Sequence, residues 1–203
     1  MSILVWNCQD LGNPWTVKGL RDLIRANNPL LVFLAETKCH SSQIEKLKRN
    51  FDLFGCSVDS QRKSGGLVLF GRSQWTSNSN PILAIIDVFV RIENSEDWWR
   101  FSGVYGEPDT SKRTEFWNLL SRLHDQSARP WLCAGDFNEI LEQSEKKGGP
   151  LRAEWQIRNF RNCLTYCQLH DMGFLGSPYT WCNNQREPLT VYERLDRVCS
   201  TAA

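Results

Sequence analysis

The feature that most constrains the fold of this chain is a set of short apolar segments that end abruptly in polar residues. The segments are 3–8, 30–34, 98–105 and 131–135. Segment 30–34 is continuously apolar, which is typical of a strand covered on both faces. The polar residues at or just after the four ends are Asn7, Glu36, Tyr105, and the pair Asp136 and Asn138. Strands of one sheet can bring such ends together at one rim, so these residues predict a polar site on rigid supports.

Amphipathic segments with helical spacing lie between these strands. Four helices are predicted, beginning near 16, 41, 110 and 155. The first, second and fourth end near 27, 49 and 167, and the third ends after 123 and before 129. Further strands are predicted at 51–57, 65–70, 82–92, 179–181 and 191–198, and a polar loop at 142–150. Gly, Ser, Asn and Asp clusters separate the middle strands, as in a meander. The chain is therefore predicted to be an α/β protein.

Length and composition narrow the class of protein. The 203 residues fit one domain, 1–203, and the hydrophobic fraction of 41%, with nine Trp and ten Phe, supplies a core. A formal net charge of +1 argues against a broad basic face, so any nucleic-acid contact must be local. The sequence shows no run of about 20 apolar residues and no signal-peptide pattern, so an intracellular protein without a membrane span is expected, not a secreted one.

The eight cysteines lack the pattern of a disulfide scaffold or a strong zinc site. No C-x-x-C pair occurs, and reduced thiols are expected. Cys163, Cys167 and His170 share one predicted helical face, which leaves zinc as an alternative. Zinc needs a fourth ligand, so a structural role for the three residues is favoured.

The polar strand ends suggest a chemistry. A carboxylate such as Glu36, with few other ligands, suits Mg²⁺, which prefers oxygen and keeps several waters. Hydrolysis of a phosphodiester needs such a metal, an activated water and donors to the phosphate. The alternative is that these polar residues follow buried strands simply because the chain reaches solvent there.

Four motifs occur in order that resemble those of the endonuclease/exonuclease/phosphatase family. They are Trp6-Asn7-Cys8, Ala35-Glu36-Thr37-Lys38, Gly103-Val104-Tyr105-Gly106 and Gly135-Asp136-Phe137-Asn138. Three later motifs resemble the LINE-type branch of non-LTR retrotransposons, notably its plant members. They are Asp171-Met172-Gly173-Phe174, Gly176-Ser177-Pro178-Tyr179-Thr180-Trp181 and Glu193-Arg194-Leu195-Asp196-Arg197. The resemblance spans essentially the whole chain.

The resemblance implies a fold and a set of roles. The fold is a DNase I-like, four-layer arrangement: a two-sheet sandwich with helices on both outer faces. Glu36 is implied as the main metal ligand with Asn7 beside it, for Mg²⁺ with Mn²⁺ as an alternative. Asp136 is implied to activate the attacking water. The other implied roles are phosphate binding by Asn138 and Tyr105, contact with the nucleic-acid backbone by Thr180, and orientation of a catalytic histidine by Asp196.

Each of these residues has a structural alternative. Asn7 suits a turn, Asp136 with Asn138 can cap a helical turn, and Tyr105 and Thr180 are ordinary strand residues. Asp196 can pair with Arg194 or Arg197 on a surface. The loop with Lys146 and Lys147 resembles one near the DNA groove of the family, although such a charged turn is usually just solvated.

The sequence departs from the family in two places. The Ser-Asp-His motif that follows Asp196 in the family is absent, and Gln9 stands where related sequences usually have Arg. The resemblance therefore implies a domain that lacks the last strands at its C-terminus and nicks DNA weakly or not at all. Loss of such catalytic groups costs about 10² to 10⁴ in rate.

The sequence leaves three functions open. The first is a Mg²⁺-dependent endonuclease that ancestrally nicked double-stranded DNA for retrotransposon insertion, as a nuclear monomer whose parent element also encodes a reverse transcriptase. The second is a non-catalytic retroelement remnant or DNA-binding scaffold. The third is a phosphatase or RNA nuclease of the same superfamily, because a fold alone does not determine the substrate.

Overall fold

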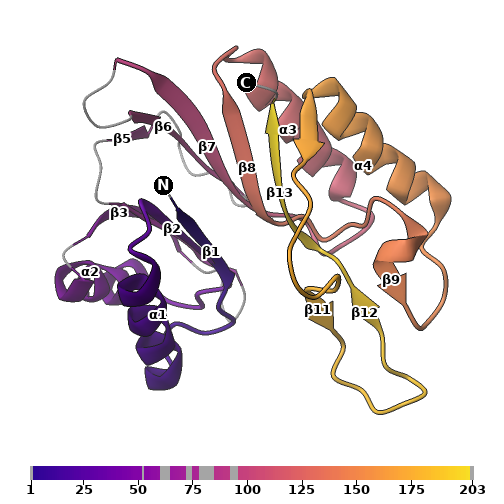
Figure 1. Ribbon diagram of the computed structural model, residues 1–203, viewed down its shortest axis with the longest axis horizontal. Helices are drawn as coiled ribbons and strands as arrows, with labels where there is room; N and C mark the ends of the chain where they lie inside the picture. Colours follow the sequence, from indigo (N-terminus) through magenta and orange to yellow (C-terminus); the bar gives the residue numbers. More distant parts are fainter. Residues whose placement is uncertain are drawn as a thin grey trace. The chain divides into compact units, whose positions relative to one another are not determined.

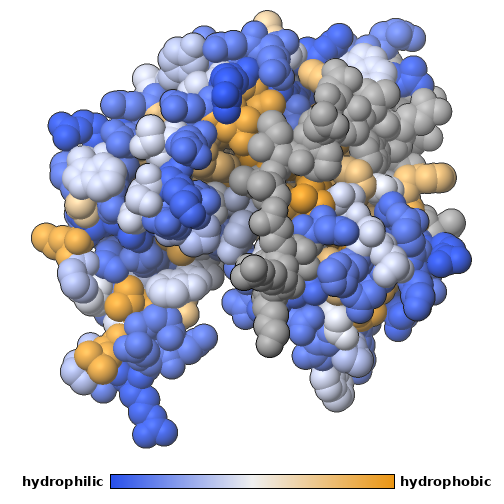
Figure 2. Space-filling view, turned by 180° about the vertical axis from the view of Figure 1, so that it is seen from behind, coloured by the Kyte–Doolittle hydropathy of each residue, from blue (hydrophilic) through white to orange (hydrophobic). Residues whose placement is uncertain are grey.

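The computed structural model describes residues 2–51, 53–59, 65–71, 75–77, 85–91 and 96–201 of the chain. These residues form two compact units, Met1–Tyr105 and Gly106–Ala203, and each is described by itself. The prediction of a single domain over 1–203 stays a prediction. No helix within the described ranges is long and apolar enough to cross a membrane. Hydrophilic residues predominate on the face in Figure 2, and hydrophobic ones are scattered over it.

The first unit begins with a four-stranded sheet in the order β1-β2-β4-β3. Its strands are β1 (Ile3–Asn7), β2 (Leu31–Ala35), β3 (Phe54–Val58) and β4 (Leu67–Gly71). β1 and β2 are parallel and α1 (Pro14–Asn27) connects them, whereas β4 is antiparallel to both of its neighbours. Asn28, in the left-handed conformation, ends α1 as the Asn-Asn-Pro pattern predicts. α2 (Ser41–Phe51) follows β2 and ends where the sequence suggested a strand.

The two central strands of the sheet, β2 and β4, are buried on both faces, as segment 30–34 predicted. Alternate residues of β2 and β4 pack against α1 and α2, and Figure 1 shows the two helices on one side of this sheet. On the other side, Phe33 of β2 meets Phe101 edge to face, with 6.4 Å between ring centroids. Phe101 belongs to the second sheet of this unit, a meander of β5 (Trp75–Ser77), β6 (Ile85–Arg91) and β7 (Trp98–Tyr105).

A close contact between the two sheets occurs at Gly103. A Cβ built there would lie 2.2 Å from the Phe33 ring, so only glycine fits. The predicted two-sheet sandwich is thus present within the first unit. Residues 82–84 and 92 of the predicted strand 82–92, and residue 52 of the predicted strand 51–57, lie outside the described residues.

The second unit contains three antiparallel strands that are neighbours in one sheet, in the order β10-β13-β8. Its strands are β8 (Trp131–Asp136), β10 (Leu169–Asp171) and β13 (Asp196–Thr201). The helices α3 (Arg113–Asp125) and α4 (Glu154–Tyr166) lie side by side (Figure 1). Their rings stack at Trp117 and Phe160, with centroids 4.7 Å apart. Together with the flanked sandwich of the first unit, this makes the protein α/β with sheets flanked by helices, as predicted.

A small sheet completes the second unit and corrects two sequence expectations. It is made of β11 (Trp181–Cys182), β12 (Tyr192–Glu193) and β9 (Lys146–Lys147), after a 3₁₀ turn at Gln143–Glu145. The predicted loop 142–150 therefore contains a turn and a strand. The predicted strand 191–198 is wrong as one element, because the chain leaves the small sheet after Glu193 and enters the other sheet at Asp196.

Candidate active site

In the first unit, the structure brings together three of the predicted site residues around one carboxylate. Oε1 of Glu36 accepts a hydrogen bond from Asn7 Nδ2 at 3.1 Å and another from the Tyr105 hydroxyl at 2.8 Å. Asn7 ends β1, Glu36 directly follows β2, and Tyr105 ends β7. Three of the strand ends in the predicted rim thus lie together in the first unit, and they include residues 69 positions apart.

The backbone at Glu36 is held in an unusual conformation. Its φ of 52° is in the left-handed region, which is rare for residues other than glycine and common at functional sites. The neighbouring Thr37 N–H donates to the carbonyl of Gly66 at 3.1 Å, and the Leu11 N–H donates to the carbonyl of Thr37 at 2.8 Å. These long-range bonds maintain the turn that presents the Glu36 carboxylate.

The oxygen atoms at Glu36 and Asn7 suit a hard divalent cation. The second carboxylate oxygen, Oε2, accepts no hydrogen bond from any residue in the described part of the chain, whereas Oε1 is held by two donors. A half-buried carboxylate and a neighbouring amide are oxygen ligands of the kind that Mg²⁺ prefers. Within the described residues, no group of three or more His, Cys, Asp and Glu is arranged to hold a metal. The Glu36 carboxylate and the Asn7 amide oxygen, with waters completing the coordination, form the arrangement that fits.

In the second unit, Asp136 and Asn138 form a tight turn at the end of β8. Oδ1 of Asp136 accepts the Asn138 N–H at 2.7 Å, and Asn138 has a φ of 54°. Nδ2 of Asn138 donates to the carbonyl of Gly106 at 2.7 Å, and the Gly106 N–H donates to the carbonyl of Asp136 at 2.6 Å. No helical turn follows within residues 137–142, so Asp136 closes a non-helical turn in place of the helix cap that the sequence offered as an alternative. The turn fixes Asn138, whose second amide hydrogen is donated to no residue in the described part of the chain.

Asp196 and Thr180 are joined to this turn by backbone contacts. Asp196 is paired in register with Asp136 across β13 and β8, so both side chains project from the same face of the sheet. The Thr180 hydroxyl accepts the N–H groups of Leu195 and Asp196, both at 3.0 Å. Its own proton remains available to donate, and Thr180 is exposed.

The two lysines of the 146–149 loop differ in environment. Nζ of Lys146 donates to Oε1 of Glu193 at 2.5 Å, and its side chain is largely buried. Lys147 is exposed. Gly148 packs against the backbone at Thr190, where an added Cβ would lie 2.2 Å from the carbonyl oxygen. Of the two lysines, only Lys147 presents its side chain fully to solvent.

Two alternatives drawn from the sequence, a zinc site and a surface ion pair of Asp196, involve residues of the second unit. Cys163 and Cys167 are buried, whereas His170 is exposed. Arg194 and Arg197 do not lie on the surface with Asp196 as their partner: both are buried and bind Glu145 and Asp171. Sequence reasoning missed the role of these two carboxylates. The only available signal was the presence of Asp171 and both arginines in the quoted motifs.

The chain belongs to the endonuclease/exonuclease/phosphatase family, whose model matches residues 4–203. Enzymes of this family typically depend on a divalent metal ion. Among curated proteins, none matches the chain in sequence.

Solved structures share the fold at low sequence identity. The 3′ phosphatase NExo from Neisseria, bound to a product DNA hairpin, is 16% identical with a TM-score of 0.76; the match covers 99% of this chain and 86% of that one. The AP endonuclease LMAP from Leishmania major is 14% identical with a TM-score of 0.77, covering 98% and 78%. The endonuclease domain of TRAS1, a telomere-specific non-LTR retrotransposon, is 13% identical with a TM-score of 0.73, covering 98% and 84%. These similarities confirm the predicted α/β fold.

Proposed function

We propose that the chain is a divalent-metal-dependent phosphodiesterase that nicks double-stranded DNA, as the endonuclease domain of a LINE-type retrotransposon. The observation that carries the proposal is the Glu36 carboxylate, held on Oε1 by Asn7 and Tyr105 with Oε2 open to a ligand. Family membership and the retrotransposon-like motifs support it. The parent element would also supply a reverse transcriptase, and the domain would act in the nucleus as a monomer.

Glu36 and Asn7 would hold the cation, Mg²⁺ or alternatively Mn²⁺. When bound, such a cation polarises a phosphate oxygen and stabilises negative charge on it. Tyr105 orients Glu36 through the one proton of its hydroxyl. To bind the scissile phosphate, that hydroxyl would turn from Glu36 and donate the same proton to a phosphate oxygen.

The residues of the second unit would supply the remaining groups. Asp136, an acceptor at the end of β8, would align or deprotonate the attacking water. Asn138 would donate its remaining amide hydrogen to a phosphate oxygen. Thr180 would donate its hydroxyl proton to the DNA backbone, and Lys147, with Lys146 as a second candidate, would contact a neighbouring phosphate.

A plasmid-nicking assay with Mg²⁺ tests the proposal, with calorimetric titration of Mg²⁺ as a second readout. Glu36→Gln removes the charge and keeps the shape, so we expect metal binding to weaken and nicking to fall by about 10² or more. Glu45→Gln, on the exposed face of α2, is the matched control and should leave both unchanged. Unchanged metal binding and nicking in Glu36→Gln would exclude this site.

A DNA-binding scaffold without cleavage is the second candidate, and the histidines favour it. His124 packs against Trp131 and Tyr166, with ring centroids 6.2 and 5.8 Å away, and His170 is exposed in β10. Binding of duplex DNA without nicking, at any Mg²⁺ concentration, would favour the scaffold. Release of phosphate from a 3′-phosphorylated oligonucleotide would instead indicate a phosphatase.

A further inference from the structure

The second unit contains a short crossing between its two sheets. β12 ends at Glu193 in the small sheet of β11, β12 and β9. β13 begins at Asp196 in the other sheet, between β10 and β8. Arg194 and Leu195 form the crossing between them. The crossing contacts two site residues, because its N–H groups bind the Thr180 hydroxyl and its end presents Asp196 opposite Asp136.

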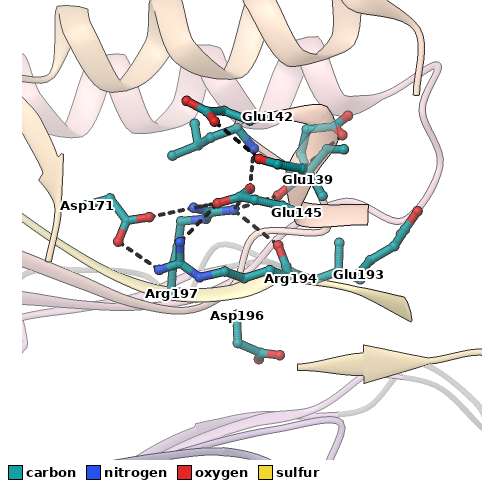
Figure 3. A network of polar contacts seen from close by, with 12 residues as sticks. Glu139, Glu142, Glu145, Asp171, Glu193, Arg194, Asp196 and Arg197 are labelled. Atoms are coloured by element: carbon teal, nitrogen blue, oxygen red, sulfur yellow. Dashed lines mark hydrogen bonds and ion pairs between the residues drawn. The ribbon is translucent and has the colours of Figure 1, made fainter. Parts of the chain in front are cut away.

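Both arginines at the crossing are held by the same two carboxylates (Figure 3). Arg194 donates from Nη1 to Glu145 Oε1 at 3.0 Å and from Nη2 to Asp171 Oδ1 at 2.9 Å. Arg197 donates from Nη2 to Glu145 Oε2 at 2.8 Å and from Nη1 to Asp171 Oδ2 at 2.6 Å. Asp171 thus gives one oxygen to each arginine. Glu145 gives Oε1 to both, because Arg197 Nη1 also donates to it at 3.2 Å, and Oε2 to Arg197 alone. We call Glu145 and Asp171 the carboxylate clamp.

The clamp is itself fixed to other parts of the unit. Oε2 of Glu145 also accepts the Leu141 N–H at 2.6 Å, and its backbone carbonyl accepts the Arg194 N–H at 2.9 Å. Oδ1 of Asp171 accepts the Gly173 N–H at 2.8 Å, and Asp171 lies in β10, which pairs with β13. These contacts leave the carboxylates little freedom to follow a moving arginine.

The four charged side chains are well shielded from water. The exposed fraction is 0% for Arg197, 9% for Arg194, 13% for Glu145 and 18% for Asp171. Charge-assisted, forked hydrogen bonds in such surroundings are strong and directional. Burying ion pairs adds little net stability compared with apolar residues of similar size. The main effect of this arrangement is therefore to fix the orientation of the two arginine side chains.

The fixed orientation of Arg197 also sets the orientation of Asp196, because the two residues are neighbours in β13. Neighbouring residues of a strand point to opposite faces, so anchoring Arg197 on one face sets Asp196 on the other. Figure 3 shows Asp196 pointing away from the clamped arginines. The carbonyl of Leu195 accepts the Phe137 N–H at 2.9 Å, which ties the crossing to the turn after Asp136.

We infer that Glu145 and Asp171 are positioning residues, which fix the crossing so that the Thr180 hydroxyl and the Asp196 carboxylate keep their places beside Asp136. The effect on nicking rests on the function proposed above. The effect on the crossing itself does not.

Amide hydrogen exchange of the whole chain tests the positioning directly. Asp171→Asn removes one charge without changing shape, and we expect the Leu195 and Asp196 amides to exchange about tenfold faster. Asp87→Asn is the matched control, since Asp87 forms a buried forked pair with Arg100 in the first unit at 2.8 and 2.9 Å. The two variants are compared at equal global stability. Equal exchange rates at Leu195 and Asp196 in both variants would overturn the inference.

Nicking kinetics test the functional consequence. We expect Asp171→Asn to lower kcat by about tenfold and to leave KM within about twofold, and Asp171→Glu to recover part of the loss. Faster exchange with unchanged kcat would overturn a role in catalysis. If the unsubstituted protein does not nick DNA, the proposed function fails. The exchange experiment alone then decides whether the carboxylate clamp fixes the crossing. Should Asp171→Asn not fold, Arg194→Lys, which keeps the charge and loses the fork, replaces it in both experiments.

Discussion

Glu36 and Asn138 have left-handed backbones at the points where their strands end, and both were predicted site residues. The apolar segments and motifs were enough to name them. Their backbone conformations could not be predicted, because distant partners hold them: the carbonyl of Gly66 accepts the N–H next to Glu36, and that of Gly106 accepts the Asn138 amide. Residue identity is local information, whereas these contacts depend on the completed fold.

Gly106 provides a test of how tightly the turn at Asp136 is built. A Cβ added there would lie 2.3 Å from the carbonyl oxygen of Phe137, and backbone cannot move aside cheaply. We expect Gly106→Ala to lower the free energy of unfolding by about 2 kcal/mol, as measured by urea denaturation. Gly19→Ala in α1 is the control, because a Cβ added at Gly19 would meet only the Trp6 side chain, at an ordinary contact distance of 3.8 Å. That substitution should raise stability by about 0.5 to 1 kcal/mol. Equal effects of the two would contradict the close packing.

The thiols offer a second prediction at this scale. Burial raises the pKa of Cys8 to about 12 and that of Cys56 to about 11, and burial likewise raises the pKa of Cys199 to about 12. The thiolate is the reactive form, so these residues should resist alkylation in the folded protein. We expect N-ethylmaleimide at pH 8 to label the half-buried Cys182 first, as read by peptide mass spectrometry. Labelling of the native protein should lose its fast phase in Cys182→Ser; rapid modification of Cys8 would contradict the burial described.

At the scale of elements, the helices and most strands of the first unit followed their sequence patterns, although α2 extends to Phe51 and β5 was not predicted. The end of the chain followed its pattern less closely. The segment 191–198 has the composition of one strand, but its residues belong to two sheets. The cause is the pair Arg194 and Arg197, whose carboxylate partners lie as far as 52 residues away along the chain. Sequence periodicity reports which side of an element is buried, and it does not report a buried ion-pair network assembled from four segments.

The carboxylate clamp makes the second unit sensitive to acid. Burial raises the pKa of Glu145, but the hydrogen bond and charge of Arg197, with smaller effects from Leu141 and Arg194, lower it further than burial raises it. Burial likewise raises the pKa of Asp171, and the Gly173 amide and both arginines outweigh it, so this pKa is also lowered. A lowered folded pKa gives stability that is present above the ordinary values of 4.5 and 3.8 and is lost as the pH falls through the folded values.

Urea denaturation at a series of pH values measures this loss. We expect the free energy of unfolding to fall as the pH drops below about 4.5, and to fall less in the double variant Glu145→Gln/Asp171→Asn. The difference in free energy of unfolding between the original protein and the double variant should therefore narrow toward low pH. A gap that stays constant from neutral pH to about pH 3 would show that the two carboxylates do not carry the acid sensitivity.

At the scale of the whole molecule, charge is the property that bears most on the proposed DNA partner. The formal net charge is +1, and several basic residues of the second unit are committed to internal carboxylates. They are Arg113, Lys146, Arg152, Arg194 and Arg197. The sequence predicted only local contacts with nucleic acid from the net charge. It could not show which basic residues are already paired, because each pairing joins segments that are distant in sequence.

The two adjacent lysines of the 146–149 loop turn this distinction into an experiment. Each phosphate contact adds about 0.9 to the slope of log affinity against log salt concentration for duplex DNA. Lys147 is exposed, so Lys147→Ala should reduce the slope by about 1, as measured by fluorescence anisotropy with a labelled duplex. Lys146 already binds Glu193 at 2.5 Å, so Lys146→Ala should leave the slope nearly unchanged, although it can lower stability. An equal change of slope in the two variants would mean that Lys146 leaves Glu193 for the DNA, and that internal pairing does not limit the binding surface.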